Sequence, residues 1–162
     1  MEMMVAMAII FTISAMVAAN YHLGNRQIVL DNQAAQFAQD VRRVQEWALS
    51  SRETAAGDEP AGYGIYVPGT GGYYLLYADS DNSKDYTNAE EDVEKVFLNN
   101  AIEISACEPT LADINYAAPD LSGKIIDGVG GQFEWAKITF KIKGGSETRN
   151  VAANIAGLVY VE

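Results

Sequence analysis

An uncharged run near the start of the chain limits the possible folds more than any other feature. Met3 to Ala19 reads MMVAMAIIFTISAMVAA and contains no charge, glycine or proline. As a helix it would be roughly 25 Å long, close to the thickness of a bilayer's hydrocarbon layer. A secretory signal peptide would have a basic start and a small-residue cleavage site, whereas here the preceding charge is Glu2 and Asn-Tyr-His follows. The segment is therefore predicted to be a retained apolar helix.

The same helix is predicted to continue with a different character. Six apolar residues recur at spacings of four and three, which is one stripe of an amphipathic helix; they are Leu30, Ala34, Phe37, Val41, Val44 and Ala48. The sequence thus predicts one helix over residues 1–52, apolar on all sides in 1–27 and on one side in 28–52. Gly24 lies near the join, and because glycine costs about 1 kcal/mol relative to alanine, the helix should loosen most easily there.

Residues 53–162 predict a head built of antiparallel strands. A hairpin is expected from Tyr63–Val67 and Tyr73–Tyr77, which flank a turn rich in glycine. The other expected strands are Val93–Leu98, Ala101–Ala106, Trp135–Lys143, Arg149–Ile155 and Leu158–Val161. Residues 108–131 are expected to be irregular apart from a short strand at 124–127. The predicted fold class is α+β, with the one-sided half of the helix packed against the sheet.

Composition argues against several functions. The formal net charge is −11, and because nucleic-acid binding depends on Lys and Arg that neutralise phosphates, no direct nucleic-acid binding is expected. Divalent cations are the partners that such a charge attracts. The single histidine, His22, follows the apolar run, so the head cannot hold a Ser/His/Asp or Cys/His set. Cys107 is the only cysteine and cannot form an intrachain disulfide. The chain is not expected to be an enzyme.

The first ten residues, MEMMVAMAII, resemble the mature start of type IV pilins and of type II secretion pseudopilins. In that family a leader is cut after a glycine, and the mature chain opens with an aromatic residue, further uncharged residues, a glutamate and an apolar run. On this match Glu2 is the family's glutamate, and the leader and about three residues would precede Met1. An acid that opens an apolar helix is rare elsewhere, which makes this short motif specific.

The resemblance implies that Glu2 pairs with the free α-amine of a neighbouring subunit during filament assembly. An ionised carboxylate in hydrocarbon is costly, so such an acid usually has a specific partner. The resemblance further implies cleavage by a leader peptidase, insertion in the membrane before assembly, an inner-membrane assembly platform, and an extracellular filament made of copies of the chain. The other interpretation is that Glu2 lies at the level of the lipid headgroups without a partner.

Within this family, the H-type pseudopilins and related minor pilins are the most similar by pattern. The resemblance rests on Ala34–Arg52, on the hairpin that follows directly, and on a final strand pair containing Val151, Ile155, Gly157 and Val159. It implies a pilin fold. DNA-receptor minor pilins with a similar head use a basic C-terminus, whereas this chain ends LVYVE, which argues against that role.

One loop of the predicted head has the spacing of a calcium-binding loop. Oxygen-bearing side chains occupy positions 1, 3, 5, 7, 9 and 12 of a twelve-residue window; they are Asp79, Asp81, Ser83, Asp85, Thr87 and Glu90. Ca²⁺ takes six to eight oxygen ligands. Against this, Lys84 occupies the sixth position, where a glycine normally makes the sharp turn, and the expected flanks are not helices. A Ca²⁺ site and a solvated acidic surface are therefore both open.

Two functions remain possible from the sequence. The first is a structural subunit, pilin or pseudopilin, of a type IV pilus-like filament assembled through the apolar helix. The second is a monomeric membrane-anchored module whose acidic head binds Ca²⁺ or a carbohydrate. The motif around Glu2 favours the first.

Overall fold

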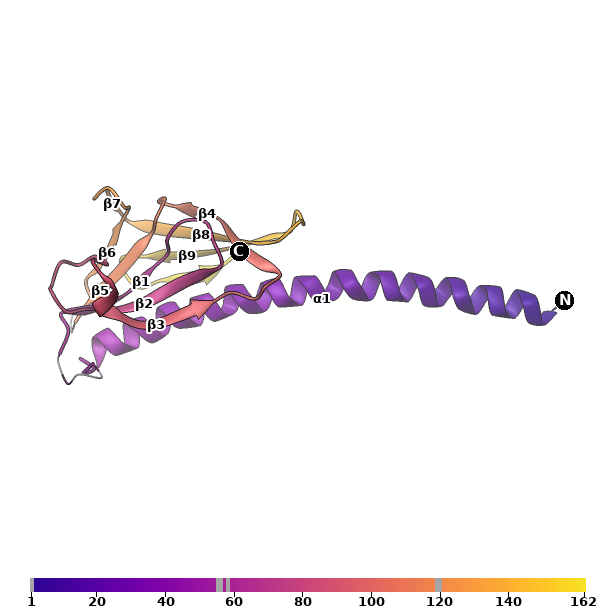
Figure 1. The fold of residues 1–162 in the computed structure, drawn as a ribbon, viewed down its shortest axis with the longest axis horizontal. Helices are drawn as coiled ribbons and strands as arrows, with labels where there is room; N and C mark the ends of the chain where they lie inside the picture. The colour runs from indigo at the N-terminus through magenta and orange to yellow at the C-terminus, as the bar shows by residue number, and fades with distance from the viewer. Residues whose placement is uncertain (1, 55–56, 58, 119–120) are drawn as a thin grey trace.

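The computed structural model describes residues 2–54, 57, 59–118 and 121–162, with the side chains of Glu2 and of residues 18–23 left outside the description. It has an α+β architecture with one long N-terminal helix, α1 (Glu2–Leu49), and two antiparallel sheets. Figure 1 shows the strands gathered beside the C-terminal half of α1, while the N-terminal half extends away from them. The predicted fold class is confirmed at this level.

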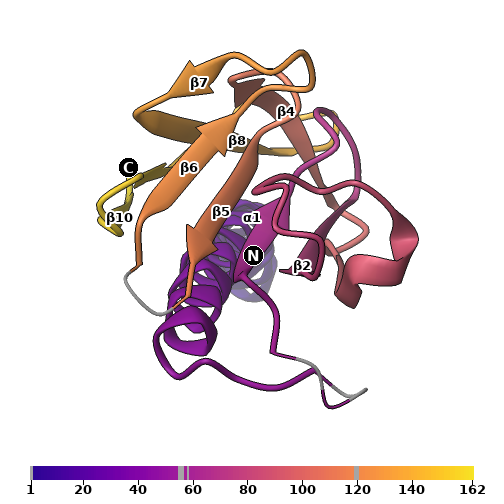
Figure 2. The ribbon, with the colours of Figure 1, turned by 90° about the vertical axis from the view of Figure 1, so that its left-hand side faces the viewer.

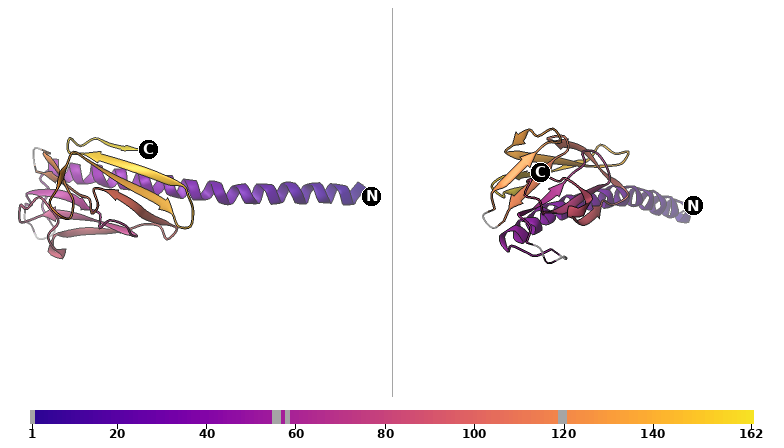
Figure 3. Two further views of the ribbon diagram at one scale, coloured as in Figure 1. Left: turned by 90° about the horizontal axis from the view of Figure 1, so that it is seen from above. Right: turned by 60° about the vertical axis from the view of Figure 1, so that its left-hand side comes forward.

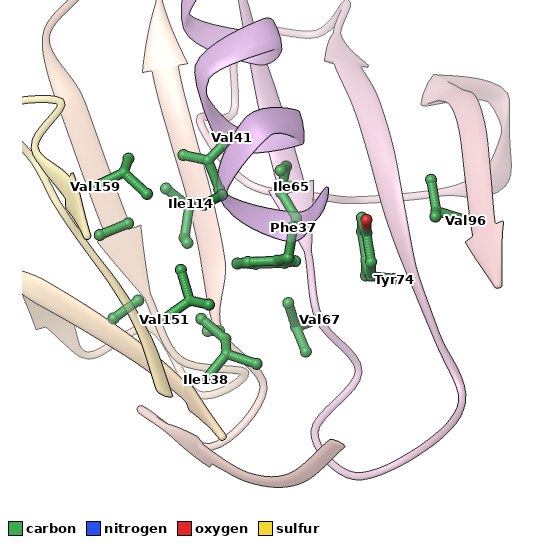
Figure 4. Packing of buried hydrophobic residues seen from close by; sticks show 14 of the residues in the cluster. Phe37, Val41, Ile65, Val67, Tyr74, Val96, Ile114, Ile138, Val151 and Val159 are labelled. Atoms are coloured by element: carbon green, nitrogen blue, oxygen red, sulfur yellow. The ribbon is translucent and has the colours of Figure 1, made fainter. Parts of the chain in front are cut away.

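The C-terminal half of α1 packs into the head through the predicted stripe. All six stripe residues, from Leu30 to Ala48, have no exposed surface. Phe37 lies at the centre, with its ring edge-on to Tyr74 at 4.9 Å between centroids and tilted against Phe140 at 5.5 Å. Figure 4 shows Phe37 and Val41 facing apolar side chains from several strands. The one-sided pattern therefore determines which face of α1 is buried.

The helix ends three residues before the predicted boundary at Arg52. Ser51 adopts a left-handed backbone conformation with φ of 45°, which an α-helix cannot continue. The Arg52 N–H donates to the Trp47 carbonyl at 3.2 Å and closes the last turn. The Arg52 guanidinium lies 4.6 Å from the centre of the Trp47 ring. These contacts direct the chain from the helix toward the first strand.

The larger sheet has six strands in the order β3-β2-β1-β5-β6-β7, all neighbours antiparallel. They are β1 (Gly62–Tyr66), β2 (Tyr73–Asp79), β3 (Asp92–Phe97), β5 (Asp113–Ala117), β6 (Gly123–Ile126) and β7 (Gln132–Phe133). A short 3₁₀ helix, η1 (Ala89–Glu91), precedes β3. The predicted hairpin is confirmed, because β1 pairs with β2 and Gly64 lies opposite Tyr77.

The smaller sheet has four strands in the order β10-β9-β8-β4. They are β4 (Ile102–Glu108), β8 (Trp135–Ile142), β9 (Thr148–Asn154) and β10 (Val159–Val161). Alternate residues of β8, from Ala136 to Ile142, are buried as predicted. The helix contacts strands of both sheets, and Figures 2 and 3 show the head seen nearly along α1 and from above.

The expectation for residues 108–131 is wrong in one element, because it missed a strand, β5. β5 lies in this range, between β1 and β6 in the larger sheet, and β6 begins one residue before the predicted strand at 124–127. β5 reads DINYA, and its polar residues Asp113 and Asn115 are buried. Polar residues usually mark an exposed position or a loop, and here tertiary partners described below allow their burial.

Candidate functional site

The N-terminal half of α1 presents apolar side chains on every side. Ten large apolar residues between Met3 and Val17 are 53–79 % exposed, and their positions leave no polar face. Thr12 lies among them, and its hydroxyl donates back to the helix, to the Ile9 carbonyl at 2.8 Å and the Ala8 carbonyl at 3.1 Å. This half of the helix is thus an apolar rod that the head leaves uncovered (Figure 1).

Glu2, the predicted assembly residue, begins α1, but its side chain lies outside the described part of the structure. A carboxylate in the first turn of a helix is favourable because of the partial positive charge of the helix N-terminus. Within the described residues, no helix has an 18-residue stretch apolar enough to count as a membrane span. Because the Glu2 side chain is not described, its role in assembly stays a prediction.

The acidic loop between β2 and η1 folds around Asp79. Asp79 ends β2 and has no exposed surface. Its Oδ1 accepts from the Ser83 N–H at 3.1 Å, and its Oδ2 accepts from the Lys84 N–H at 3.0 Å. Lys84 adopts a left-handed backbone with φ of 62°, so the sharp turn expected at the sixth position exists although it lacks a glycine. The two hydrogen bonds to a charged acceptor offset the cost of that conformation.

Asp81 and Glu91 meet Asp79 in one cluster. One carboxylate oxygen from each of the three lies within 4.8 Å of the other two. The Thr87 hydroxyl lies 3.2 Å from Asp81 Oδ2 and 3.0 Å from Glu91 Oε2, and the Thr87 N–H donates to the same Glu91 oxygen at 2.9 Å. Hard, oxygen-only groups of this kind are typical ligands of divalent cations.

The structure brings together only part of the predicted ligand set. Two of the six predicted ligands, Asp79 and Asp81, supply carboxylates to the cluster, and a third, Thr87, contacts it through its hydroxyl. The other three predicted ligands are not part of it: Ser83, Asp85 and Glu90. The Ser83 hydroxyl donates to the Asp85 carbonyl at 2.9 Å instead. Glu91 takes the position expected for Glu90, because Asn88 caps η1 through the Glu90 N–H and the tight turn leaves Glu90 exposed and Glu91 buried.

A second buried carboxylate, Asp113, anchors the loop to the sheet. Tyr77 reaches it across β1, where Gly64 leaves room because any Cβ at that position would collide with the Tyr77 ring. The Tyr77 hydroxyl donates to Asp113 Oδ1 at 2.6 Å, and the Tyr86 N–H, in the loop, donates to Oδ2 at 2.6 Å. The Asn115 amide donates to the Tyr77 oxygen at 3.2 Å. Sequence reasoning missed this network; the alternation of polar and apolar residues in DINYA was its only signal.

The pKa values of the carboxyl groups in this region depend mainly on how deeply each group is buried. Burial raises the pKa of Asp113 to about 7, against the hydrogen bonds from Tyr77 and Tyr86 that lower it. Burial also raises the pKa of Asp79, and the charges of Asp81 and Glu91 add to that effect. Asp81 itself is exposed, and hydrogen bonds from Ser83 lower its pKa. The loop thus concentrates negative charge beside buried carboxyl groups.

A separate hollow of about 820 Å³ lies on the outer face of the smaller sheet. Its wall includes the half-exposed rings of Phe133, Trp135 and Tyr160, and Trp135 and Tyr160 meet edge-to-face at 5.8 Å between centroids. Lys137 and Glu108 add polar groups. Such a surface can accept a ligand with both flat apolar and hydroxyl-bearing faces.

Comparison of the chain with protein-family models, curated proteins and solved structures finds no match.

Proposed function

We propose that the chain is a structural subunit, with a pilin fold, of a type IV pilus-like filament that assembles through the N-terminal half of α1. The observation that carries the proposal is the contrast along one unbroken helix. Residues 30–48 bury their apolar stripe in the head, whereas the apolar residues between Met3 and Val17 remain uncovered on all sides. The amino-terminal motif around Glu2 supports the same function.

Covering the exposed apolar residues of the N-terminal half of α1 would contribute a large free energy to assembly. Full burial of a large apolar side chain contributes about 1.5–3 kcal/mol, so ten of them contribute roughly 15–30 kcal/mol before the cost of association is subtracted. A partner that covers one face would leave the others in water. Apolar surroundings on every side are provided by a bilayer before assembly and by a bundle of identical helices after it.

In such a filament, which is extracellular, the head faces outward. Because the sequence of the head resembles H-type pseudopilins, the subunit would be a pseudopilin or a minor pilin. Glu2 pairs with the α-amine of a neighbouring copy, so that two charges neutralise each other inside the apolar bundle. A leader peptidase and an inner-membrane assembly platform would act before the subunit joins the filament.

The test is Glu2→Ala, measured as fibres sheared from cells that produce the protein and as subunit retained in the membrane fraction. We expect fibres to fall by at least about tenfold, since 1.4 kcal/mol of lost interaction per contact already gives that factor, with the membrane level unchanged. The matched control is Glu46→Ala, which removes an exposed glutamate from the packed half of the same helix and should assemble normally. Normal fibre yield from Glu2→Ala would refute the proposed pairing.

The aromatic hollow favours a second candidate, the monomeric membrane-anchored module, in the form that binds a carbohydrate through its head. Trp135 and Tyr160 offer ring faces of the kind on which sugar rings stack. Extraction in mild detergent separates the two functions, because the module would remain monomeric and no fibre containing the chain would be found in the sheared fraction.

A further inference from the structure

Three carboxylates converge at the end of β2 without a positively charged partner. Asp79 and Glu91 are buried, Asp81 is exposed, and their nearest oxygens lie within 4.8 Å of one another. None of the ion pairs among the described residues involves any of the three. Like charges at this separation disfavour joint ionisation, so the loop needs either a proton on one carboxylate or a bound cation to relieve the repulsion.

An independent observation concerns Glu91 itself. The residue is 4 % exposed, and its Oε1 is buried without a hydrogen-bond partner among the described residues. The carboxylate is aimed into the cluster, because its Oε2 and Asp81 Oδ2 both contact the Thr87 hydroxyl. An unpaired buried acceptor costs about 1–3 kcal/mol, and more when it is charged.

The cluster also has fewer donors than its oxygens require. The Thr87 hydroxyl carries one hydrogen and lies within hydrogen-bond distance of two carboxylate oxygens, at 3.0 and 3.2 Å. It can donate to only one of them at a time. A bound cation would attract both oxygens and the lone pairs of the hydroxyl, which would then direct its hydrogen elsewhere.

We propose that Asp79, Asp81, Glu91 and the Thr87 hydroxyl bind one divalent cation, with Ca²⁺ preferred over Mg²⁺. Ca²⁺ accepts six to eight oxygen ligands in a flexible geometry, whereas Mg²⁺ requires a near-ideal octahedron, and three carboxylates with a hydroxyl from one irregular loop suit the first. The exposed Asp81 gives the ion access from solvent, and waters complete the coordination. The site goes beyond the filament function and does not depend on it.

The experiment uses the full chain in detergent micelles, with Ca²⁺ binding measured by calorimetry and thermal unfolding followed in EDTA, Ca²⁺, Mg²⁺ and NaCl of matched ionic strength. A ligand that binds only the native state stabilises it, so Ca²⁺ should raise the Tm by several degrees at a hundredfold excess over Kd. Mg²⁺ should raise it less, and NaCl least. Equal shifts in all three salts would overturn the proposal.

Neighbouring glutamates provide the matched pair. Glu91→Gln should weaken Ca²⁺ binding by more than about tenfold, since even indirect contacts to a metal change affinity by that much, whereas Glu90→Gln should stay within about twofold of the original Kd. Asp81→Asn changes an exposed position that does not support the core, and it should weaken Ca²⁺ binding as much as Glu91→Gln does. This second variant tests the site even if Glu91→Gln fails to fold. Unchanged binding in Asp81→Asn, or equal losses from the two glutamate variants, would overturn the ligand set.

Discussion

The two halves of α1 differ in apolar content and, more tellingly, in how the apolar residues are placed around the helix. In residues 3–17 they occur on all sides and remain exposed, whereas in residues 30–48 they form one stripe with no exposed surface. Both halves are equally helical, so helix formation does not explain the difference. The angular distribution decides it: a single stripe can be covered by the chain's own sheets, and an apolar surface on all sides requires surroundings that a domain of this size does not supply.

Phenylalanine substitutions test this contrast with the largest expected effect. Phe37 is fully buried between Tyr74 and Phe140, and Phe11 is 76 % exposed. Phe37→Ala should lower the free energy of unfolding by about 3–5 kcal/mol because it leaves a cavity, measured by denaturant titration in detergent. Phe11→Ala should change it by less than about 0.5 kcal/mol and should reduce fibre yield instead. Similar losses of stability from both variants would remove the distinction between the halves.

The pH dependence of stability should arise in the head, because residues 3–19 contain no ionisable side chain. Burial raises the pKa of Asp113 from 3.8 to about 7, so between these values the native state binds a proton that the unfolded chain has released. The free energy of unfolding therefore falls as pH rises through this window. One pKa unit corresponds to about 1.4 kcal/mol.

Asp113→Asn, which cannot titrate, isolates this contribution. We would measure the free energy of unfolding of both proteins in EDTA at several pH values. The value for the unmodified chain minus the value for the variant should fall by at least about 2 kcal/mol between pH 4 and pH 8. Hydrogen exchange of residues 3–17, corrected for intrinsic rates, should not change over the same range. Parallel pH profiles for the two proteins would show that Asp113 does not titrate in this window.

The packed half of α1 is also joined to the sheet by a polar contact. The Tyr74 hydroxyl donates to Asp40 Oδ2 at 2.5 Å, and burial raises the pKa of this carboxyl. Tyr74→Phe should cost about 1.5–3 kcal/mol, the range for hydrogen bonds to charged groups. Tyr160→Phe is the control, because Tyr160 is 39 % exposed whereas Tyr74 has no exposed surface. A loss no larger than that of the control would mean that Asp40 finds another donor.

Elements defined by a regular pattern could be predicted from the sequence, and contacts between distant segments could not. The stripe of α1, the hairpin β1–β2 and the alternation of β8 each follow from side-chain periodicity alone. β5 was missed because its polar face is buried by Tyr77 and by the Tyr86 segment, which come from elsewhere in the chain. Gly64 had no visible role until the path of the Tyr77 ring across β1 was known.

The acidic loop illustrates the same limit at a finer scale. Its position and its acidic residues follow from the sequence, whereas the sharp turn at Lys84 does not, because a lysine at the sixth position argued against it. The choice between Glu90 and Glu91 depends on the 3₁₀ turn that Asn88 caps, and a fixed twelve-residue spacing selects the wrong neighbour for the cluster. Adjacent acids differ in burial because of backbone geometry, which spacing alone does not reveal.

The smallest effect is expected at Gly24, near the boundary between the two halves. The helix is unbroken there, and a methyl group on Gly24 would meet no atom within 4 Å beyond the backbone of its own helical turns. Gly24→Ala should therefore stabilise the local helix by about 0.5–1 kcal/mol and slow amide exchange in residues 20–30 by about two- to fivefold, with little change in the unfolding of the head.

If assembly requires the helix to loosen at this boundary, the same substitution should lower fibre yield, because it makes loosening more costly. Gln27→Ala, an exposed change with a smaller effect on helix propensity, is the control. Fibres from Gly24→Ala that match those from Gln27→Ala in yield and curvature would show that α1 enters the filament as a continuous helix, and the boundary would then be one of packing alone.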